Sequence, residues 1–154
     1  MKLERAEHLA LCLMEDHGLS NWQFAFDDAV RRFGSCCHSK KTITLSAALV
    51  ELNGEDKVKQ TILHEIAHAL VGVEHDHNET WRQKAISIGH HGGRCYEKDV
   101  VTPKKPFIGT CPSCDRQIPA FRRRKIACGK CCRAFNKGAY TSKFRIKWSR
   151  AKAI

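Results

Sequence analysis

The chain has 154 residues, nine cysteines and a formal net charge of +11. Its length suits one compact domain, or a domain of about 100 residues with a small appendage. No apolar run approaches the roughly 20 residues that a membrane-spanning helix needs, and the charged first five residues lack the apolar stretch of a secretory signal. We therefore expect a monomeric cytoplasmic protein without membrane contact, in which the cysteines stay reduced instead of forming disulfides.

The charge is divided unevenly along the chain. Residues 1–100 carry 12 Lys/Arg and 15 Asp/Glu, a net charge of −3, whereas residues 101–154 carry 15 Lys/Arg and one Asp, a net charge of +14. Pro103 and Pro106 stand near this change, in a stretch without apolar periodicity. We predict two domains, residues 1–100 and residues 101–154. A neutral or acidic body beside a strongly basic segment is typical of a protein with a polyanion-binding module.

Apolar periodicity predicts helices and strands in the first domain. Helices are expected over residues 3–13, 47–53 and 55–71, and from residue 79 until a break at residues 90–93. Strands are expected over residues 22–26, 30–36 and 42–45. Gly18 can end the first helix, and Ser46 and Asn78 can cap the second and the fourth, because their side-chain oxygens accept hydrogen bonds from free backbone N–H groups. The pattern predicts an α+β domain.

The long helix over residues 55–71 carries the motif His64-Glu65-Ile66-Ala67-His68. Residues four apart share one face of a helix, so His64 and His68 can offer two imidazoles to one metal ion. Glu65 projects beside the same edge, as in HExxH zinc sites, where a carboxylate takes a proton from water at the metal. A free His-Glu-His face would be costly to bury on so apolar a helix. We predict a zinc site with His64 and His68 as ligands and Glu65 as the catalytic base.

A catalytic zinc site needs a third protein ligand and an open fourth position. The loop after the helix offers four side chains that bind metals, Glu74, His75, Asp76 and His77. The residues alone leave this choice open, with His77 and His75 as the leading candidates.

Two CxxC motifs, at residues 111–114 and 128–131, lie in the basic segment with 13 residues between them. Paired knuckles of this kind are typical of a closed four-cysteine zinc ribbon, whereas a redox CxxC does not explain two in tandem. The segment has few apolar residues, so zinc should supply most of its folding free energy. Cys132 is an alternative to Cys131, although it breaks the two-residue spacing. We predict a second, structural zinc bound by Cys111, Cys114, Cys128 and Cys131. We interpret the other four cysteines, Cys12, Cys36, Cys37 and Cys95, as structural.

Cations and aromatic side chains alternate in and around the two CxxC motifs. Cations contact phosphates, and exposed aromatic rings can stack on unpaired bases. The candidate rings are Phe121, Phe135, Tyr140, Phe144 and Trp148. The alternative is that the aromatic rings pack a small core while the cations only face solvent. We favour nucleic-acid binding. The predicted nucleic-acid contacts are Arg122, Arg123, Arg124, Lys125, Lys143, Arg145 and Lys147.

In combination, these motifs resemble the SprT-like metalloproteases, a family that includes Spartan. The matching segments are residues 22–26, 31–36, 43–46 and 61–70. The family pattern continues with a histidine four residues before an aromatic residue, which His77 and Trp81 match, so the resemblance implies His77 as the third ligand. Asn78 departs from the Gly that often follows this histidine. Members often end in a zinc ribbon with an arginine run between its knuckles, as here.

The resemblance implies a small zincin-type, minigluzincin-like catalytic domain with a three-stranded antiparallel sheet and the HExxH helix, followed by the four-cysteine zinc ribbon. It also implies a zinc endopeptidase with two zinc ions per chain, one catalytic and one structural, which cleaves proteins bound or crosslinked to DNA. We expect single-stranded or branched DNA as the partner in preference to a plain duplex, and a cytoplasmic protein associated with the nucleoid. Two alternatives remain. One is a zinc-ribbon nucleic-acid-binding protein whose HExxH motif holds a metal without proteolysis. The other is a peptidase that acts on free proteins.

Overall fold

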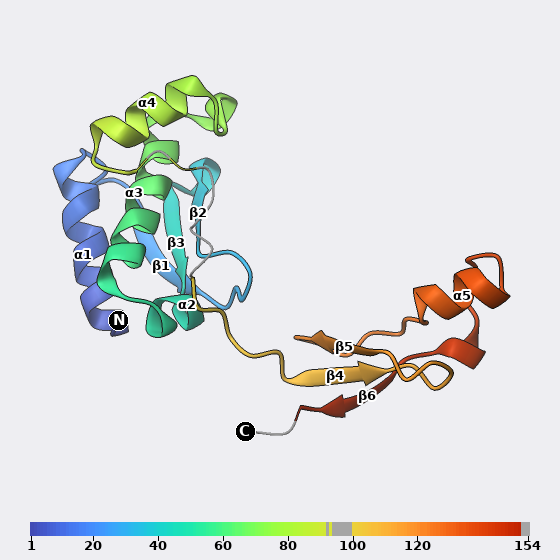
Figure 1. Cartoon of the computed structure of the whole chain (residues 1–154). Coiled ribbons are helices and arrows are strands. Elements are labelled where there is room, and N and C mark those ends of the chain that lie inside the picture. Colours follow the sequence, from blue (N-terminus) through green and yellow to red (C-terminus); the bar gives the residue numbers. More distant parts are fainter. Residues whose placement is uncertain (92, 94–99, 152–154) are drawn as a thin grey trace. The chain divides into compact units, whose positions relative to one another are not determined.

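A computed structural model describes residues 1–91, 93 and 100–151 (Figure 1). The chain forms two compact units, Met1–Pro103 and Lys104–Ile154. Within the described part of the chain, none of the helices has the length and apolar character needed to cross a membrane.

The first unit follows the predicted order of helices and strands. Its α-helices are α1 (Leu3–Asp16), α2 (Ala47–Leu52), α3 (Glu55–Val71) and α4 (Glu79–Ser87), and its strands are β1 (Gln23–Asp27), β2 (Gly34–Cys37) and β3 (Thr42–Ser46). Two short 3₁₀ helices, η1 (His38–Lys40) and η2 (Val73–His75), lie in the connections. Both predicted caps are confirmed, because Ser46 accepts a hydrogen bond from Leu49 N and Asn78 accepts one from Trp81 N.

The three-stranded sheet is mixed, so the prediction of an antiparallel sheet was wrong. The strand order is β1-β3-β2, in which β2 pairs antiparallel with β3 while β1 pairs parallel with it. The chain reverses direction between β1 and β2 and again between β2 and β3, so β3 runs in the same direction as β1. Because β3 lies between the other two strands, one of its pairings is parallel and β2 is left at an edge of the sheet (Figure 1).

Strand β2 starts at Gly34, later than the predicted start at residue 30. The side chain of Asp27 accounts for the difference. Its carboxylate accepts a hydrogen bond from Ala29 N at 2.9 Å and lies 2.6 Å from the Arg32 guanidinium. An aspartate that bonds the backbone two residues ahead favours a turn over an extended strand, so residues 28–32 form a loop.

The main core of this unit fixes α3 against the sheet and against α1. The predicted apolar face of α3 is confirmed, since Val58, Ile62 and Ile66 are fully buried. They pack with Ile43 and Leu45 of β3 and with small side chains of α1. The turns of α3 that carry the HExxH motif are therefore held rigidly beside β2.

The second unit has an antiparallel sheet with the order β5-β4-β6. Its described elements are β4 (Phe107–Thr110), β5 (Gln117–Ala120), α5 (Gly129–Phe135), η3 (Ser142–Phe144) and β6 (Lys147–Arg150). Among the described residues, the buried cluster of this unit consists of four cysteines with Phe144 and Ile146, and a few partly buried apolar side chains pack against it. So small a core is a weak source of folding free energy without a metal or another cross-link.

Candidate functional site

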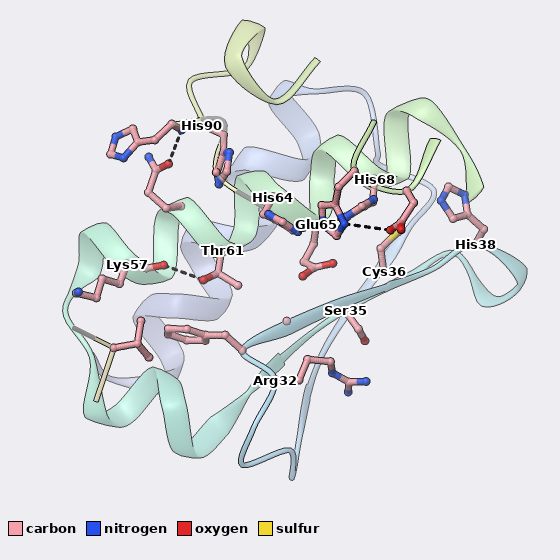
Figure 2. Close-up of a pocket in the computed structure, with 18 of the residues that line it drawn as sticks. Arg32, Ser35, Cys36, His38, Lys57, Thr61, His64, Glu65, His68 and His90 are labelled. Atoms are coloured by element: carbon pink, nitrogen blue, oxygen red, sulfur yellow. Dashed lines mark hydrogen bonds and ion pairs between the residues drawn. The ribbon is translucent and has the colours of Figure 1, made fainter. Parts of the chain in front are cut away.

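Three histidines converge at the end of α3 in the first unit. His64 and His68 lie one helical turn apart on α3, and the loop after this helix brings His77 back to them. The Nε2 atoms lie 3.2 Å apart in His64 and His68, 3.1 Å apart in His68 and His77, and 3.0 Å apart in His77 and His64. The three nitrogens thus form a nearly equilateral triangle. Figure 2 shows two of the three side chains, His64 and His68, on α3.

Hydrogen bonds between the imidazoles cannot satisfy this triangle. A ring nitrogen is either a donor or an acceptor, so at least one of three mutual contacts joins two donors or two acceptors. A cation bound by three lone pairs removes the conflict. Tetrahedral zinc with Zn–N bonds of about 2.05 Å places its nitrogens about 3.3 Å apart, close to the observed separations. The donor set therefore fits a zinc ion.

Burial keeps two of these imidazoles neutral. Desolvation, with the neighbouring imidazoles, lowers the pKa of His64 to about 3. The pKa of His68 falls to about 4, again mainly through desolvation, although Asp76 opposes the shift. Histidine binds metals through a neutral imidazole, so both side chains are in the ligand form at neutral pH.

The loop between α3 and α4 selects His77 over His75. Gly72 ends α3 with φ of +94°, and a Cβ there would lie 2.8 Å from a carboxylate oxygen of Glu74, so the turn requires glycine. His75 is directed instead to Asn78 and Glu74, at 3.1 Å and 3.8 Å. Only His77 joins the cluster, as the family pattern implied.

Asp76 and Trp81 support the three imidazoles. Asp76 Oδ1 lies 3.1 Å from Nδ1 of His77, where a carboxylate favours the tautomer that leaves the Nε2 lone pair free. Trp81 is fully buried, and its ring centroid lies 4.7, 5.2 and 4.7 Å from those of His64, His68 and His77. Trp81 is the aromatic residue of the family pattern, but no pattern in the sequence indicates its contact with all three histidines.

Glu65 lies between α3 and β2, beside the histidines (Figure 2). Its side chain is buried, and the residue is only 7% exposed. Burial raises the pKa of Glu65 to about 8, and the nearby Arg32 guanidinium opposes this shift. A carboxyl group whose pKa is near neutrality is suited to accept and return a proton.

A cleft of about 730 Å³ runs over the histidines and Glu65. Its walls come from residues 32–36 around β2, from α3, from the loop after α3 and from residues around His90. Cys36, which we interpreted as structural, lies in this wall, and the His90 ring is 5.4 Å from that of His64. No local pattern in the sequence indicates that these two residues face the cleft. Cys95 lies outside the described residues.

The four predicted ribbon cysteines come together in the second unit. The Sγ atoms of Cys111 and Cys131 are 3.8 Å apart, as are those of Cys114 and Cys128. A disulfide requires about 2.05 Å, whereas tetrahedral zinc with Zn–S bonds of about 2.3 Å separates its sulfurs by about 3.8 Å. The cluster therefore fits zinc. Cys132 is buried in the core of the unit and does not belong to the group of four.

A basic groove of about 770 Å³ also lies in the second unit. It is lined by six of the seven predicted cations, Arg123, Arg124, Lys125, Lys143, Arg145 and Lys147, whereas Arg122 lies outside it. Trp148 donates from Nε1 to the carbonyl of Arg124 at 2.8 Å and so fixes one wall. Phe144 is buried in the core, so it is not available for base stacking, whereas Phe135 is 74% and Tyr140 58% exposed.

The fold and site define an α+β domain with three clustered histidines, followed by a basic unit with four clustered cysteines. The model of the SprT-like family matches residues 7–101, and the chain belongs to this family. No curated protein matches it. Among solved structures, the crystal structure of the metallopeptidase zymogen of Methanocaldococcus jannaschii jannalysin has 15% sequence identity and a TM-score of 0.46, over 53% of this chain and 79% of that chain.

Replacement of His77 by Ala is expected to remove zinc from the first unit. The triangle loses one nitrogen, and His75 cannot replace it because its ring is directed to Asn78 and Glu74. Zinc content per chain, measured by mass spectrometry after dialysis, should fall by one ion relative to the wild type. His75→Ala is the matched control and should keep its zinc. Equal zinc loss from both variants would contradict the ligand assignment.

Proposed function

We propose that the protein is a zinc-dependent endopeptidase of the zincin type. The observation that carries this proposal is the triangle of Nε2 atoms, which faces one cleft together with Glu65. Glu65 lies on α3 between the two helical histidines. His64, His68 and His77 would hold the ion. Bound zinc would lower the pKa of water towards about 7 and polarise a peptide carbonyl.

Glu65 is the proton carrier of the proposed reaction. Its carboxylate accepts a proton from the water that attacks the peptide carbonyl carbon. It then gives a proton to the amine that leaves when the C–N bond breaks, so the products are a carboxylic acid and an amine. Burial supports this role, because a carboxyl group with a pKa near neutrality both takes and returns a proton readily.

The position of β2 at the edge of the sheet is an argument for a polypeptide as the substrate. Among the described residues β2 pairs only with β3, and its residues line the cleft. An exposed strand edge can pair with an extended peptide through backbone hydrogen bonds, largely irrespective of the peptide sequence. A peptide held along β2 would pass over Glu65 and the three histidines.

We further propose that the second unit directs this activity to proteins bound or crosslinked to DNA. The support is the groove lined by six cations, in a segment with a net charge of +14. Its structure would depend on a second zinc, held by Cys111, Cys114, Cys128 and Cys131. The exposed rings of Phe135 and Tyr140 favour DNA with unpaired bases, because stacking needs accessible base faces. The protein would work as a monomer in the nucleoid.

The test is cleavage of a DNA-binding protein by the full chain, with single-stranded DNA, duplex DNA or no DNA. We expect cleavage that DNA stimulates, that a chelator stops and that added zinc restores. Equal cleavage without DNA would favour a peptidase acting on free proteins. DNA binding without substrate cleavage or self-cleavage under any condition would favour a nucleic-acid-binding protein whose histidines hold metal structurally.

The groove itself can be tested with paired charge removals. The double variant Arg124→Gln/Arg145→Gln removes two cations from the groove, and Arg122→Gln/Arg116→Gln removes two from outside it. The groove variant should bind a single-stranded oligonucleotide at least about 10-fold more weakly, and the slope of log K against log salt should fall by about 1.4.

The variant outside the groove should lose less than about 3-fold, because it forfeits only long-range attraction. Fluorescence anisotropy over a series of salt concentrations measures both quantities. Equal losses in the two variants, or binding that does not depend on salt, would contradict the groove as the phosphate-binding surface.

A further inference from the structure

The cleft face of β2 consists of small residues. Side chains alternate between the two faces of a strand, and Ser35 is directed to the far face, where its Oγ lies 2.9 Å from Thr44 Oγ1. Gly34 is buried on the opposite face, where α3 packs closest to the strand. Its backbone pairs with Leu45 of β3, so its position is fixed by the sheet.

Gly34 is in close contact with Glu65. A Cβ built on Gly34 would lie 2.8 Å from Cγ and 2.8 Å from Oε1 of Glu65, and 3.0 Å from Cγ2 of Thr61. Ordinary van der Waals contacts of a Cβ begin at about 3.4 Å. Real Cβ atoms essentially never lie closer than 3.0 Å to such an atom, so any other residue at this position must push the Glu65 side chain by at least about 0.2 Å, and by about 0.6 Å to restore ordinary contact.

The Glu65 side chain has to absorb this displacement. The backbone of α3 is fixed by Ile62 and Ile66, which are fully buried in the main core. The backbone of β2 is fixed by its ladder with β3. Glu65 is itself buried and lines the cleft beside the three histidines, so a shift of its side chain changes the place of the carboxylate relative to them.

We propose that Gly34 is the positioning residue of the active site, and that its missing side chain sets the Glu65 carboxylate at its working position. This inference rests on the proposed peptidase function and explains why a glycine stands in an otherwise regular strand. Displacement of a catalytic group by a fraction of an ångström to one ångström costs up to about 100-fold in rate.

The experiment compares Gly34→Ala with Gly54→Ala in the full chain. Gly54 precedes α3 with φ of −76°, and a Cβ there meets no atom within 4 Å, so this variant adds the same methyl group in open space. With zinc bound, Gly34→Ala should lower kcat by about 10- to 100-fold with KM within about twofold of the wild type. Gly54→Ala should match the wild type.

A crystal structure of Gly34→Ala provides a measurement that does not depend on activity. The Glu65 carboxylate should be displaced by about 0.2–0.6 Å or more, while the three Nε2 atoms stay in place. In the variant Gly34→Ala/Thr61→Ala the new methyl group no longer meets Thr61 Cγ2 but still meets Glu65. This variant should show the same loss of kcat even if Gly34→Ala alone folds poorly. Thr61→Ala is its control.

An undisplaced carboxylate would overturn the inference whether or not the protein is a peptidase. Full activity of Gly34→Ala would also overturn it, and so would a loss of activity that is fully explained by a loss of bound zinc. A wild-type protein without cleavage, combined with a displaced carboxylate in the variant, would reject the proposed function and leave the contact between Gly34 and Glu65 established.

Discussion

Replacement of Glu65 by Gln is expected to abolish cleavage while the protein keeps its fold and its zinc. The amide has nearly the same shape as the carboxyl group, so it fills the same buried space against Gly34. It cannot accept a proton from water at neutral pH. General-base catalysis contributes about 10²- to 10⁴-fold, so kcat should fall by about that factor. The measurement is a DNA-stimulated cleavage assay with wild type and Glu65→Gln side by side.

The matched control is Glu79→Gln, in the first turn of α4 and exposed to solvent. It should retain full activity. Zinc content and thermal melting of all three proteins should agree, which separates a chemical effect from unfolding. A Glu65→Gln protein whose kcat stays within about tenfold of the wild type would contradict the proposed mechanism.

Replacement of Cys128 by Ser is expected to unfold the second unit and leave the first intact. The unit has a small apolar core, and binding of a structural zinc by four cysteines is worth about 10 kcal/mol or more. Loss of one thiolate removes most of this free energy. Residues 104–154 should become sensitive to protease, zinc content should fall by one ion per chain, and DNA affinity should fall with them.

Cys132→Ser is the control for this experiment. Cys132 is as buried as Cys131 and follows it directly, but it lies outside the group of four sulfurs. Its replacement should keep the zinc and cost at most about 1–2 kcal/mol through lost packing. A folded, zinc-loaded Cys128→Ser protein would contradict the ligand set, and so would zinc loss in Cys132→Ser.

The helices of the first unit were predictable because their causes are local. The apolar period from Val58 to Ile66 defines α3, and the side chains of Ser46 and Asn78 mark the starts of α2 and α4. The direction of β1 was not predictable in this way. A strand that pairs in parallel has the same alternation as one that pairs antiparallel, and only the central place of β3 decides between them.

The site residues also divide into those that a local pattern predicts and those that only the tertiary arrangement brings together. His64 and His68 follow from helical spacing, whereas the choice between His75 and His77 depends on the path of the loop after α3, in which His77 contacts the other two histidines and His75 contacts Asn78. The contact of Gly34 with Glu65 joins two distant segments and leaves no periodic signal. In the basic unit, the charge run predicts a polyanion surface. It does not show that Arg122 lies outside the groove, because neighbouring loop residues face different directions.

Trp81 belongs to a small cluster with Ala67 of α3 and Ala85 of α4, separate from the main core. The same indole contacts the three histidine rings, so the three-histidine cluster lies where these two helices pack together. A ligand that binds only when α3 and α4 are packed together stabilises this packing relative to a state in which α4 is detached. The affinity of the three histidines for zinc and the stability of α4 packing on α3 would therefore be coupled, and a change in one would change the other. A substitution that loosens α4 far from the cleft would release metal without touching a ligand.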